Sequence, residues 1–539
     1  MGKISILDCT LRDGAYIVNG KFEGAKISGI IDKLQNSNID LIECGWLKDN
    51  DYTDGSSYYH VPQDMKAYVK HKKENATFIA MIDYNRYNCD NLPDRKGEIL
   101  DAIRVVFPVG KVKEGLEAAQ KIRKKGYDVY LQLANTLGYT DAELIEVAQR
   151  INEFKPKTVS IVDTFGTMYP WDLERLIIIL DNNLSKDIAL GFHSHNNQQL
   201  SFALAIQFIE KCLFLSDRDI VVDCSLCGMG RGAGNACTEL LANYINKKFS
   251  SSYNMDEIMN CIDLYMVELM SEYDWGYTIP YALAGIYGCH VNNVSYLLDT
   301  HRTQYKDMRM IFEKMDASKR VQYDYDNLEK VYYECVYSNI NDDDTSKWLS
   351  DRFNGKEVLL ILPGQSVDIY KEQIKEFIRQ QDVITVGINS WLDGFEYDLV
   401  FFTNVLKYEY AMNNKKNVFY NTEKLITSNI KSQPDENEWI INIKDQLTRP
   451  GKYHDNSAII FLWILSQYKS KKIYVAGFDG YKNKDIIYAK SALAPNVSDE
   501  KEYRIIHQEL EDMIKDLVTN SDIDLKFITP SPFEKYERK

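Results

Sequence analysis

Short apolar runs alternate with amphipathic helical patterns over the first 225 residues. The runs are rich in Ile, Val and Leu, which is typical of strands that are buried on both faces. Between them, Ile27, Ile30, Ile31 and Leu34 have the i, i+3, i+4, i+7 spacing of one helix face. Eight βα units in series predict a (β/α)8 (TIM) barrel, with a doubly wound open sheet as the alternative. The expected strands are Lys3–Leu7, Ile39–Cys44, Thr77–Ile82, Ala102–Phe107, Asp128–Leu133, Thr158–Val162, Ile188–Phe192 and Ile220–Asp223.

A second α/β pattern begins at Lys356, after a mostly helical stretch. It predicts a three-layer, Rossmann-like domain. We therefore expect a barrel over residues 1–290, a helical extension and connector over 291–354, and the second domain over 355–539. Asn341–Asp344 reads as a solvated linker. The expected strands of the second domain are Lys356–Leu362, Asp382–Ile388, Leu399–Phe402, Lys472–Ala476 and Asp524–Thr529, with helices near 457–468 and 502–518.

Composition narrows the class of protein. The chain has 539 residues, which predicts two to four domains. Its 79 acidic and 64 basic residues give a net charge of −15, which disfavours nucleic-acid binding. No apolar run approaches the ~20 residues of a membrane span, and the N-terminus lacks the pattern of a signal peptide. We therefore expect a cytoplasmic protein with reduced cysteines; all ten cysteines precede residue 336.

Two polar motifs follow expected barrel strands. Asp8-Cys9-Thr10-Leu11-Arg12-Asp13-Gly14 follows the first strand, and His193-Ser194-His195-Asn196-Asn197 follows the seventh. Barrel active sites lie at the carboxyl ends of strands, and residues i and i+2 of an extended segment point the same way. Two histidines and the Asp13 carboxylate would form a mixed N/O metal site. A surface Asp–Arg turn and two exposed loop histidines are the alternatives.

A glycine-rich loop, Cys227–Asn235, follows the eighth strand. Its glycines allow close approach of the backbone to a ligand, and this loop often binds substrate anions in barrels. Asn235 could supply a fourth metal ligand through its amide oxygen. Reading Gly228-x-Gly230 as a dinucleotide fingerprint would require the first strand of a βαβ unit, and this strand is the eighth. Cys224-x-x-Cys227 has no second pair, which favours packing over zinc binding.

In combination, these motifs resemble the metal-dependent aldolase and lyase superfamily that includes 4-hydroxy-2-oxovalerate aldolase, hydroxymethylglutaryl-CoA lyase and isopropylmalate synthase. The resemblance covers about residues 1–290, and the hydroxy-oxovalerate aldolase branch looks closest. It is carried by Thr10-Leu11-Arg12-Asp13-Gly14, Ile42-Glu43-Cys44-Gly45, Asp163-Thr164-Phe165-Gly166, His193-x-His195-Asn196-Asn197 and Gly228-x-Gly230-x-Gly232-Ala233-Gly234-Asn235.

The resemblance implies a carbon–carbon lyase acting on a 2-oxo acid, with an aldehyde as the second product. Mn²⁺ or Mg²⁺ on the Asp13, His193, His195 and Asn235 set would chelate the oxo acid and stabilise its enolate. Arg12 would add positive charge at the same oxygen, and Glu43 would orient Arg12 or a water. The implied substrate-binding residues are Thr164, Gly230 and Gly232.

One position departs from the aldolase pattern. The family has a histidine after Arg-Asp-Gly-x, and this chain has Tyr16. A tyrosine can donate or relay a proton, but with a reference pKa of about 10 it is a poor resting base. An acyl-CoA-dependent Claisen lyase or synthase, and a non-catalytic barrel scaffold, are the alternative functions.

The second domain resembles, more loosely, bacterial sialyltransferase-like domains that bind a CMP-sugar. Leu360–Ser366 has the form of a strand, a glycine turn and a helix start, which suits phosphate. The resemblance implies a nucleotide site with Tyr481 in the family's Gly-x-Asp-x-Tyr motif and His507 near the position of a catalytic base. Asp455-Asn456-Ser457-Ala458 lacks the glycine of the family's Thr-Ser-Gly segment, so a non-catalytic or different nucleotide-handling domain is the alternative. The implied nucleotide-lining residues are Gly364, Gln365, Ser366, Asn389 and Asn404.

Together the two resemblances imply a bifunctional enzyme, an aldolase fused to a glycosyltransferase-like domain, in surface polysaccharide biosynthesis. A sugar nucleotide would be the additional small-molecule partner. A homodimer is compatible with this interpretation.

Overall fold

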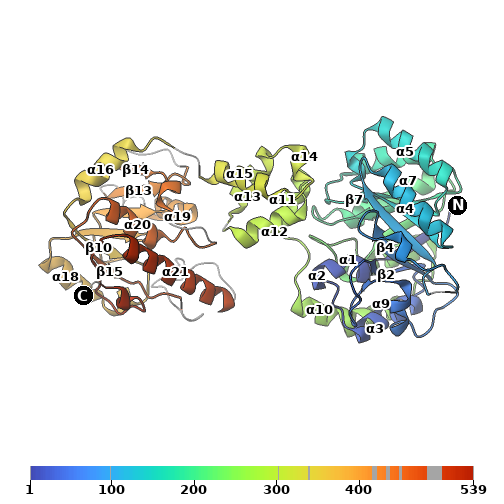
Figure 1. The fold of residues 1–539 in the computed structure, drawn as a ribbon, viewed down its shortest axis with the longest axis horizontal. Coiled ribbons are helices and arrows are strands. Elements are labelled where there is room, and N and C mark those ends of the chain that lie inside the picture. The colour runs from blue at the N-terminus through green and yellow to red at the C-terminus, as the bar shows by residue number, and fades with distance from the viewer. Residues whose placement is uncertain are drawn as a thin grey trace. The chain divides into compact units, whose positions relative to one another are not determined.

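The computed structural model describes residues 2–97, 99–301, 303–337, 340–415, 422–431, 437–447, 452–481 and 500–537. They form two compact units (Figure 1). The first unit comprises Met1–Val294 and Met315–Tyr323, and the second comprises Ser295–Lys314 and Asp324–Lys539. The boundary falls inside one helix, α12 (Val291–Thr300), and the chain returns once to the first unit before it continues into the second.

The first unit is a closed parallel β-barrel, as the sequence predicts. Its strands pair in the order β1-β9-β8-β7-β6-β5-β4-β2, and pairing of Leu7 with Leu41 and of Asp8 with Ile42 closes the ring. A two-residue strand, β3 (Tyr58–Tyr59), lies beside β2. The barrel strands are β1 (Ile4–Asp8), β2 (Leu41–Leu47), β4 (Thr77–Asp83), β5 (Ala102–Pro108), β6 (Asp128–Ala134), β7 (Thr158–Asp163), β8 (Ala189–Ser194) and β9 (Ile220–Cys224).

Among the described residues, helices follow six of the eight barrel strands, whereas β2 is followed by β3 and a 3₁₀ turn and β4 by a 3₁₀ turn. Pro62–Ala67 and Cys89–Asn91 stand where helices would follow β2 and β4. Those segments are rich in Asp, Asn and Tyr and have no apolar stripe of helical period, so they have no face to pack on the barrel. The helices of this unit are α1 (Thr10–Asp13), α2 (Ala15–Val18), α3 (Gly24–Asn36), α4 (Val112–Lys124), α5 (Asp141–Phe154), α6 (Pro170–Asn183), α7 (Ser201–Leu215), α8 (Thr238–Phe249), α9 (Met255–Cys261), α10 (Val267–Glu272), α11 (Ile279–Tyr287) and α14 (Ala317–Arg320).

The barrel interior is built in layers. One buried apolar cluster contains Leu7, Cys9, Leu41, Ile79, Ala102 and Val221. Two residues further along three of these strands stand Glu43, Arg104 and Asp223, all buried. Because side chains alternate with period two along a strand, the charged residues belong to the same inner face. The layer toward the carboxyl ends of the strands is therefore ionic.

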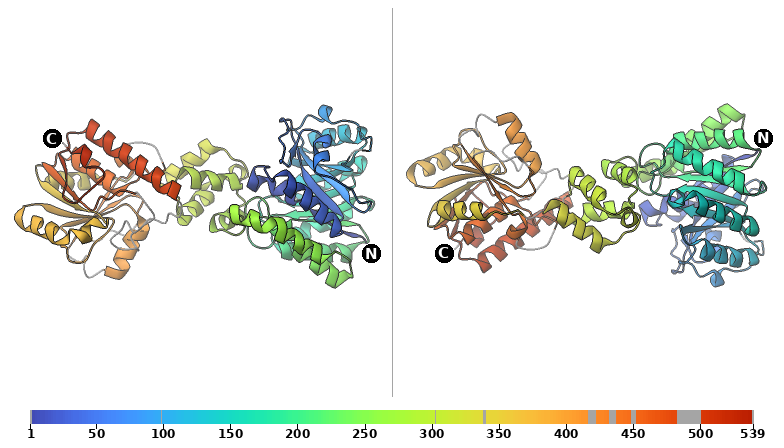
Figure 2. Two further views of the ribbon diagram at one scale, coloured as in Figure 1. Left: turned by 90° about the horizontal axis from the view of Figure 1, so that it is seen from below. Right: turned by 90° about the horizontal axis from the view of Figure 1, so that it is seen from above.

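The second unit contains a seven-stranded parallel sheet in the order β14-β13-β12-β11-β10-β15-β16. Val358, Leu360 and Leu362 pack into one buried cluster, whereas Leu359 and Ile361 pack into another, so both faces of β10 are covered. Figure 2 shows helices on the two faces of this sheet. Its strands are β10 (Glu357–Ile361), β11 (Ile384–Ile388), β12 (Leu399–Phe402), β13 (Glu423–Thr427), β14 (Glu438–Ile441), β15 (Lys472–Ala476) and β16 (Leu525–Phe527).

Two features of this unit differ from the sequence prediction. β13 and β14 were not predicted, because each is short and begins with Glu. The expected linker at Asn341–Asp344 instead starts a helix, with Asp342 as N-cap and two acidic residues in the first turn, where they favour the helix dipole. The helices are α13 (Tyr305–Lys314), α15 (Tyr325–Val336), α16 (Asp343–Phe353), α17 (Ser366–Ile369), α18 (Lys371–Gln380), α19 (Val405–Lys415), α20 (Ser457–Gln467) and α21 (Glu500–Asn520).

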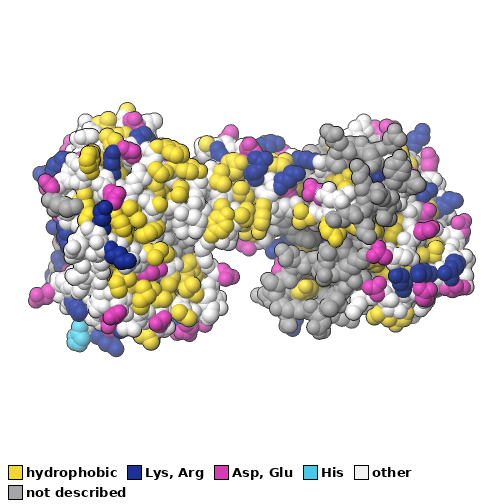
Figure 3. Space-filling model, turned by 180° about the vertical axis from the view of Figure 1, so that it is seen from behind, with side chains coloured by type: hydrophobic (Ala, Val, Ile, Leu, Met, Phe, Trp, Pro, Cys, Tyr) yellow, Lys and Arg dark blue, Asp and Glu magenta, His cyan; other side chains and the backbone are white. Residues whose placement is uncertain are grey.

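Over the described part of the chain, no helix combines the length and apolar character needed to cross a membrane. On the face drawn in Figure 3, acidic and basic side chains are scattered among hydrophobic and neutral ones.

Candidate metal centre and second-unit pocket

Asp13 lies at the carboxyl end of β1, in the single turn α1. Asp8 ends the strand and accepts a hydrogen bond from the backbone N–H of Thr10, which starts that turn. The Asp13 side chain is 1% exposed. Its Oδ1 accepts from Arg12 Nη1 at 2.5 Å, and its Oδ2 accepts from Asn235 Nδ2 at 2.9 Å and from the Arg231 backbone N–H at 3.2 Å. The carboxylate is therefore held in place by groups that follow the first and the last strand of the barrel.

His193 and His195 at the end of β8 face this carboxylate. One potential ligand atom each from Asp13, His193 and His195 lies within 4.8 Å of the other two. His195 Nδ1 lies 3.1 Å from the Asp163 carbonyl oxygen, which leaves Nε2 at 3.6 Å from Asp13 Oδ2. Among the described residues, His195 Nε2 and Asn235 Oδ1 are buried and find no hydrogen-bond partner. Unsatisfied buried polar atoms are costly, and a cation would satisfy both, so the residues present fit a divalent metal.

A buried chain of alternating charges connects two of these three residues. Arg12 Nε donates to Glu43 Oε2 at 2.7 Å, and Arg104 Nη1 donates to the same oxygen at 3.1 Å. Arg104 Nη2 donates to Asp223 Oδ2 at 2.5 Å, and that oxygen lies 3.0 Å from His193 Nδ1. We call this set the buried ion network. The carboxylate–histidine contact is the arrangement that orients histidine ligands in metal sites.

The charges of the network favour a bound cation. Three carboxylates, on Asp13, Glu43 and Asp223, meet the guanidinium groups of Arg12 and Arg104, so one negative charge lacks compensation when the histidines are neutral. Burial would raise the pKa of Asp13, but the Arg12 guanidinium and the two histidines hold it well below its usual range. Burial lowers the pKa of His193 despite the nearby Asp223 carboxylate, which keeps its imidazole neutral and able to bind a metal.

The glycine-rich loop lets its backbone pass close to this carboxylate. A Cβ on Gly230 would lie 2.4 Å from Asp13 Oδ2, and one on Gly232 would lie 2.7 Å from Asn197 Oδ1. Gly232 also has a φ of +66°, a conformation that favours glycine. These two residues are therefore required by the geometry around Asp13 and Asn197, whether or not they also touch a substrate.

The other predicted barrel residues have identifiable contacts. Glu43 holds Arg12, which is one of the two roles expected for it. Thr164 uses its hydroxyl to accept from the Asn135 backbone N–H at 2.6 Å. The Tyr16 ring lies 6.0 Å from that of Trp46 and beneath the Arg231 guanidinium. Although Tyr16 is 43% exposed, its crowded hydroxyl has a raised pKa, with burial as the largest cause, so it suits proton donation better than proton abstraction.

Asp8 gives a testable pH dependence of barrel stability. Burial raises its pKa to about 6, against hydrogen bonds from Thr238 and Thr10. The unfolded chain titrates near pH 4, so between pH 4 and 6 the folded state binds more protons and the free energy of unfolding falls as pH rises. Asp8→Asn should remove up to about 3 kcal/mol of this decline. Urea unfolding of the wild type, Asp8→Asn and the exposed control Asp51→Asn at pH 4, 5, 6 and 7 measures this effect. The same change of unfolding free energy with pH in all three proteins would contradict it.

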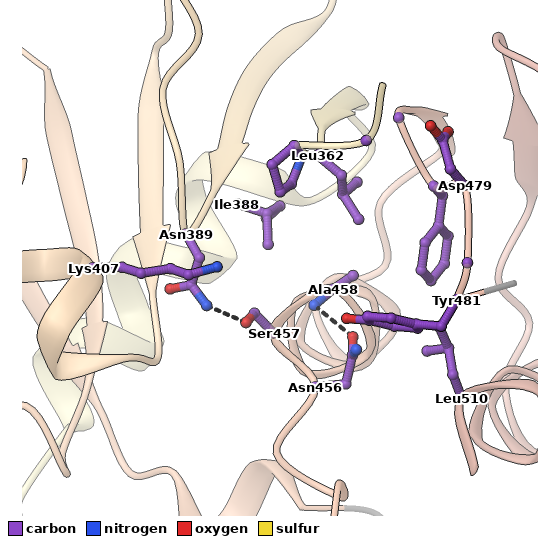
Figure 4. A pocket seen from close by; sticks show the side chains of 15 residues that line it. Leu362, Ile388, Asn389, Lys407, Asn456, Ser457, Ala458, Asp479, Tyr481 and Leu510 are labelled. Carbon is purple, nitrogen blue, oxygen red and sulfur yellow. Dashed lines mark hydrogen bonds between the residues drawn. The ribbon is translucent and has the colours of Figure 1, made fainter. Parts of the chain in front are cut away.

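The second unit has a pocket at the carboxyl edge of its sheet, where β10 lies between β11 and β15. Turns after these three strands contribute Gly364, Asn389 and Tyr481, all predicted for the nucleotide site (Figure 4). In Figure 4, Lys407 and Asn389 lie on one side of the pocket, the start of α20 below it, and Tyr481 on the opposite side. Asn389 donates to Ser457 Oγ. Crevices at a point where the strand order of the sheet reverses, as it does beside β10, are the usual ligand sites of open parallel sheets.

The remaining predicted residues of this unit have structural contacts rather than positions in the pocket lining. The Ser366 hydroxyl donates to the Asp479 carboxylate and also forms a hydrogen bond with the Thr529 hydroxyl, so it connects the turns that follow three strands. Asn404 caps α19 by accepting from the Lys407 backbone N–H at 3.1 Å. His507 Nδ1 accepts from the Tyr481 backbone N–H at 3.1 Å and so holds the tyrosine loop. Gln365 is exposed at the start of α17.

Sequence reasoning missed two members of the buried ion network. Arg104 interrupts the apolar strand Ala102–Pro108, and Asp223 is the penultimate residue of β9. A charge in the middle of a buried strand is a signal in itself, because such residues are almost never buried without a partner. Reading the strands for inward-facing charges would have found both.

The barrel is similar in sequence to known aldolases and to a decarboxylase. Residues 109–264 match the family described as HMGL-like. The chain is 26% identical over 248 residues to an oxaloacetate decarboxylase of Mycobacterium tuberculosis, covering 45% of this chain and 70% of that protein. It is 25% identical over 348 residues to a 4-hydroxy-2-oxovalerate aldolase of Carboxydothermus hydrogenoformans, covering 62% and 98%.

Among solved structures, the HMG-CoA lyase of Brucella melitensis aligns with a TM-score of 0.39 at 16% identity, covering 50% of this chain and all of that one. The matched family region lies inside the first unit, so the sialyltransferase resemblance of the second unit stays a prediction. Within the first unit, residues 109–264 are thus similar to the HMGL-like family, in agreement with the resemblance to aldolases and lyases that the barrel motifs carry.

Proposed function

We propose that the barrel cleaves 4-hydroxy-2-oxo acids into pyruvate and an aldehyde, in the manner of the 4-hydroxy-2-oxovalerate aldolases it is similar to. The observation that carries this proposal is the buried Asp13, His193 and His195 set, together with the unsatisfied Asn235 Oδ1 beside it. These residues would hold Mn²⁺ or Mg²⁺. The bound cation would supply Lewis-acid polarisation of the 2-oxo group.

The chain's own residues support the electrostatics of this cleavage. Arg12 uses Nε and Nη1 in the buried ion network, which leaves Nη2 for an oxygen of the oxo acid. Glu43 fixes Arg12 from the other side, so the positive charge is oriented before the substrate arrives. Thr164 and the backbone at Gly230 and Gly232 would position the substrate.

The reaction breaks the bond between C3 and C4 of the substrate. The C4 hydroxyl loses its proton and becomes the aldehyde carbonyl, while the electron pair left on C3 takes up a proton to give pyruvate. Tyr16, with its raised pKa, is suited to donating or relaying a proton rather than to abstracting one at rest.

The direct test measures pyruvate release from 4-hydroxy-2-oxo acids of increasing chain length, with Mn²⁺, with Mg²⁺ and with a chelator. We expect turnover that depends on the metal and stops with the chelator. Consumption of an acyl-CoA without pyruvate release would favour the Claisen alternative. Absence of both activities, with no divalent ion bound by the purified protein, would favour the scaffold alternative.

We further propose that the pocket of the second unit binds a sugar nucleotide, because three predicted residues from different turns, Gly364, Asn389 and Tyr481, line it. With a CMP-sugar as its ligand, the second unit would serve the same process as the barrel, the synthesis of an acidic surface sugar. Thermal shift with CMP, UMP and GMP tests this: CMP should raise the melting temperature in a concentration-dependent way. Tyr481→Phe tests the pocket, with exposed Tyr410→Phe as control, and an equal response to all nucleotides would contradict CMP selectivity.

A further inference from the structure

Three basic side chains stand around the carboxyl ends of the barrel strands, outside the buried ion network. Lys48 directly follows β2, Arg86 follows β4, and Arg231 lies in the loop after β9. Aromatic rings of Trp46, Tyr16, Tyr58 and Tyr323 lie between them. We call the three basic residues the cationic belt.

Lys48 is half-buried and has no carboxylate partner in the part of the chain that the structure describes. Its Nζ lies 3.2 Å from the centroid of the Tyr58 ring and 6.0 Å from that of Trp46. Burial, with a smaller contribution from Arg86, lowers the pKa of Lys48. Aromatic faces replace only part of the water that a lysine loses, so this ammonium would gain from an anion.

Arg231 connects the belt to the candidate metal centre. Its backbone N–H donates to Asp13 Oδ2, and its guanidinium carbon lies 4.9 Å from the centroid of the Tyr16 ring. Its Nη2 donates to Asn292 Oδ1 at 2.5 Å and lies 3.3 Å from His290 Nε2. These partners are neutral, since burial, with a smaller contribution from Arg231, lowers the pKa of His290 to about 3. Over the described residues the Arg231 charge therefore has no carboxylate partner either.

Arg86 completes the belt with only partial compensation. Its Nη2 donates to the Tyr323 hydroxyl at 3.1 Å, and its Nε lies 3.5 Å from Asp83 Oδ2. The Tyr323 ring lies 4.9 Å from that of His290, which stands beside Arg231. Three positive charges thus share one carboxylate, on a chain whose net charge is −15. Positive charges that cluster on an otherwise acidic protein repel one another, and a bound anionic ligand would relieve this repulsion.

We propose that the aldehyde half of the substrate carries an anionic group, a carboxylate or a phosphate, which Lys48 and Arg231 bind while the 2-oxo acid occupies the metal centre. This inference rests on the proposed aldolase function and narrows its substrate class. It places the anion on the side of Asp13 that faces the glycine-rich loop, because Arg231 contacts that carboxylate through its backbone.

The experiment runs the reaction as condensation of pyruvate, with Mn²⁺, onto matched aldehydes. Succinic semialdehyde is compared with butanal, and glyceraldehyde 3-phosphate with glyceraldehyde. The wild-type protein should prefer the anionic member of at least one pair by about tenfold or more in kcat/KM. The pair with the larger preference distinguishes carboxylate from phosphate.

Two variants and two controls test the residues. Lys48→Met should lower kcat/KM for the preferred anionic aldehyde by about tenfold and leave its neutral counterpart within about twofold, and Arg231→Met should lower kcat/KM more for the anionic aldehyde than for the neutral one. Lys48→Arg should retain the preference, and Lys124→Met, an exposed lysine of α4, should change nothing. Equal losses for the anionic and neutral aldehydes, or a wild-type preference for neutral ones, would overturn the inference.

A separate readout distinguishes this inference from the function on which it rests. Metal-dependent exchange of the pyruvate methyl protons with deuterium oxide, followed by NMR, needs no aldehyde. We expect this exchange in the wild type and in Lys48→Met. Exchange without anion selectivity would overturn the inference alone, whereas absence of exchange in the wild type would overturn the proposed function as well.

Discussion

His193→Ala is expected to weaken divalent-metal binding by at least about 100-fold and to abolish metal-dependent turnover. His193 is one of only three side chains that bring ligand atoms within 4.8 Å of one another in this centre, among the described residues. Its removal also leaves the Asp223 carboxylate with Arg104 as its one charged partner. Titration calorimetry with Mn²⁺ and the pyruvate-release assay measure the two effects.

Two further variants make this result specific. His71→Ala removes an exposed histidine and should bind Mn²⁺ and turn over as the wild type does. Asp223→Asn keeps His193 but weakens the contact that orients it, so affinity should fall by about 10- to 100-fold, less than in His193→Ala. Unchanged Mn²⁺ affinity in His193→Ala would show that the metal, if any, binds elsewhere.

Arg104→Met is expected to destabilise the barrel by about 3–5 kcal/mol. Arg104 is 1% exposed and lies between Glu43 and Asp223, so the variant leaves two buried carboxylates facing each other with fewer cations. Removing one member of a buried set of ion pairs lowers the free energy of unfolding by more than the intact set contributes to it, because the remaining charges stay desolvated. Hydrogen exchange of the β5 and β6 amides in urea reports on this unit separately from the second one.

The matched control for Arg104→Met is Lys124→Met, which introduces the same side chain at an exposed position of α4 and should stay within about 0.5 kcal/mol of the wild type. Mn²⁺ should partly restore Arg104→Met, since a cation at Asp13 offsets the excess negative charge of the network. A loss below about 1 kcal/mol would mean that Glu43 or Asp223 becomes protonated in the variant instead of remaining charged.

Local patterns in the sequence predict much of this architecture. Short, nearly continuous apolar runs separated by amphipathic helical patterns were enough to predict all eight barrel strands, because a parallel strand buried on both faces is apolar along its whole length. The same reasoning missed β13 and β14, whose glutamates weaken the apolar signal. It also expected helices after β2 and β4, where the chain forms 3₁₀ turns because no apolar stripe is available to pack.

The sequence by itself determined the residues that the candidate metal centre brings together, because strand ends of a barrel converge and Asp13, His193 and His195 each sit at such an end. Only the tertiary structure decided how they are held. Arg104 and Asp223 enter the buried ion network from β5 and β9, and Lys48, Arg86 and Arg231 form the cationic belt from three separate loops. Charge pairing acts through space across long stretches of chain, so neither set leaves a local motif, and closure of the barrel alone brings them together.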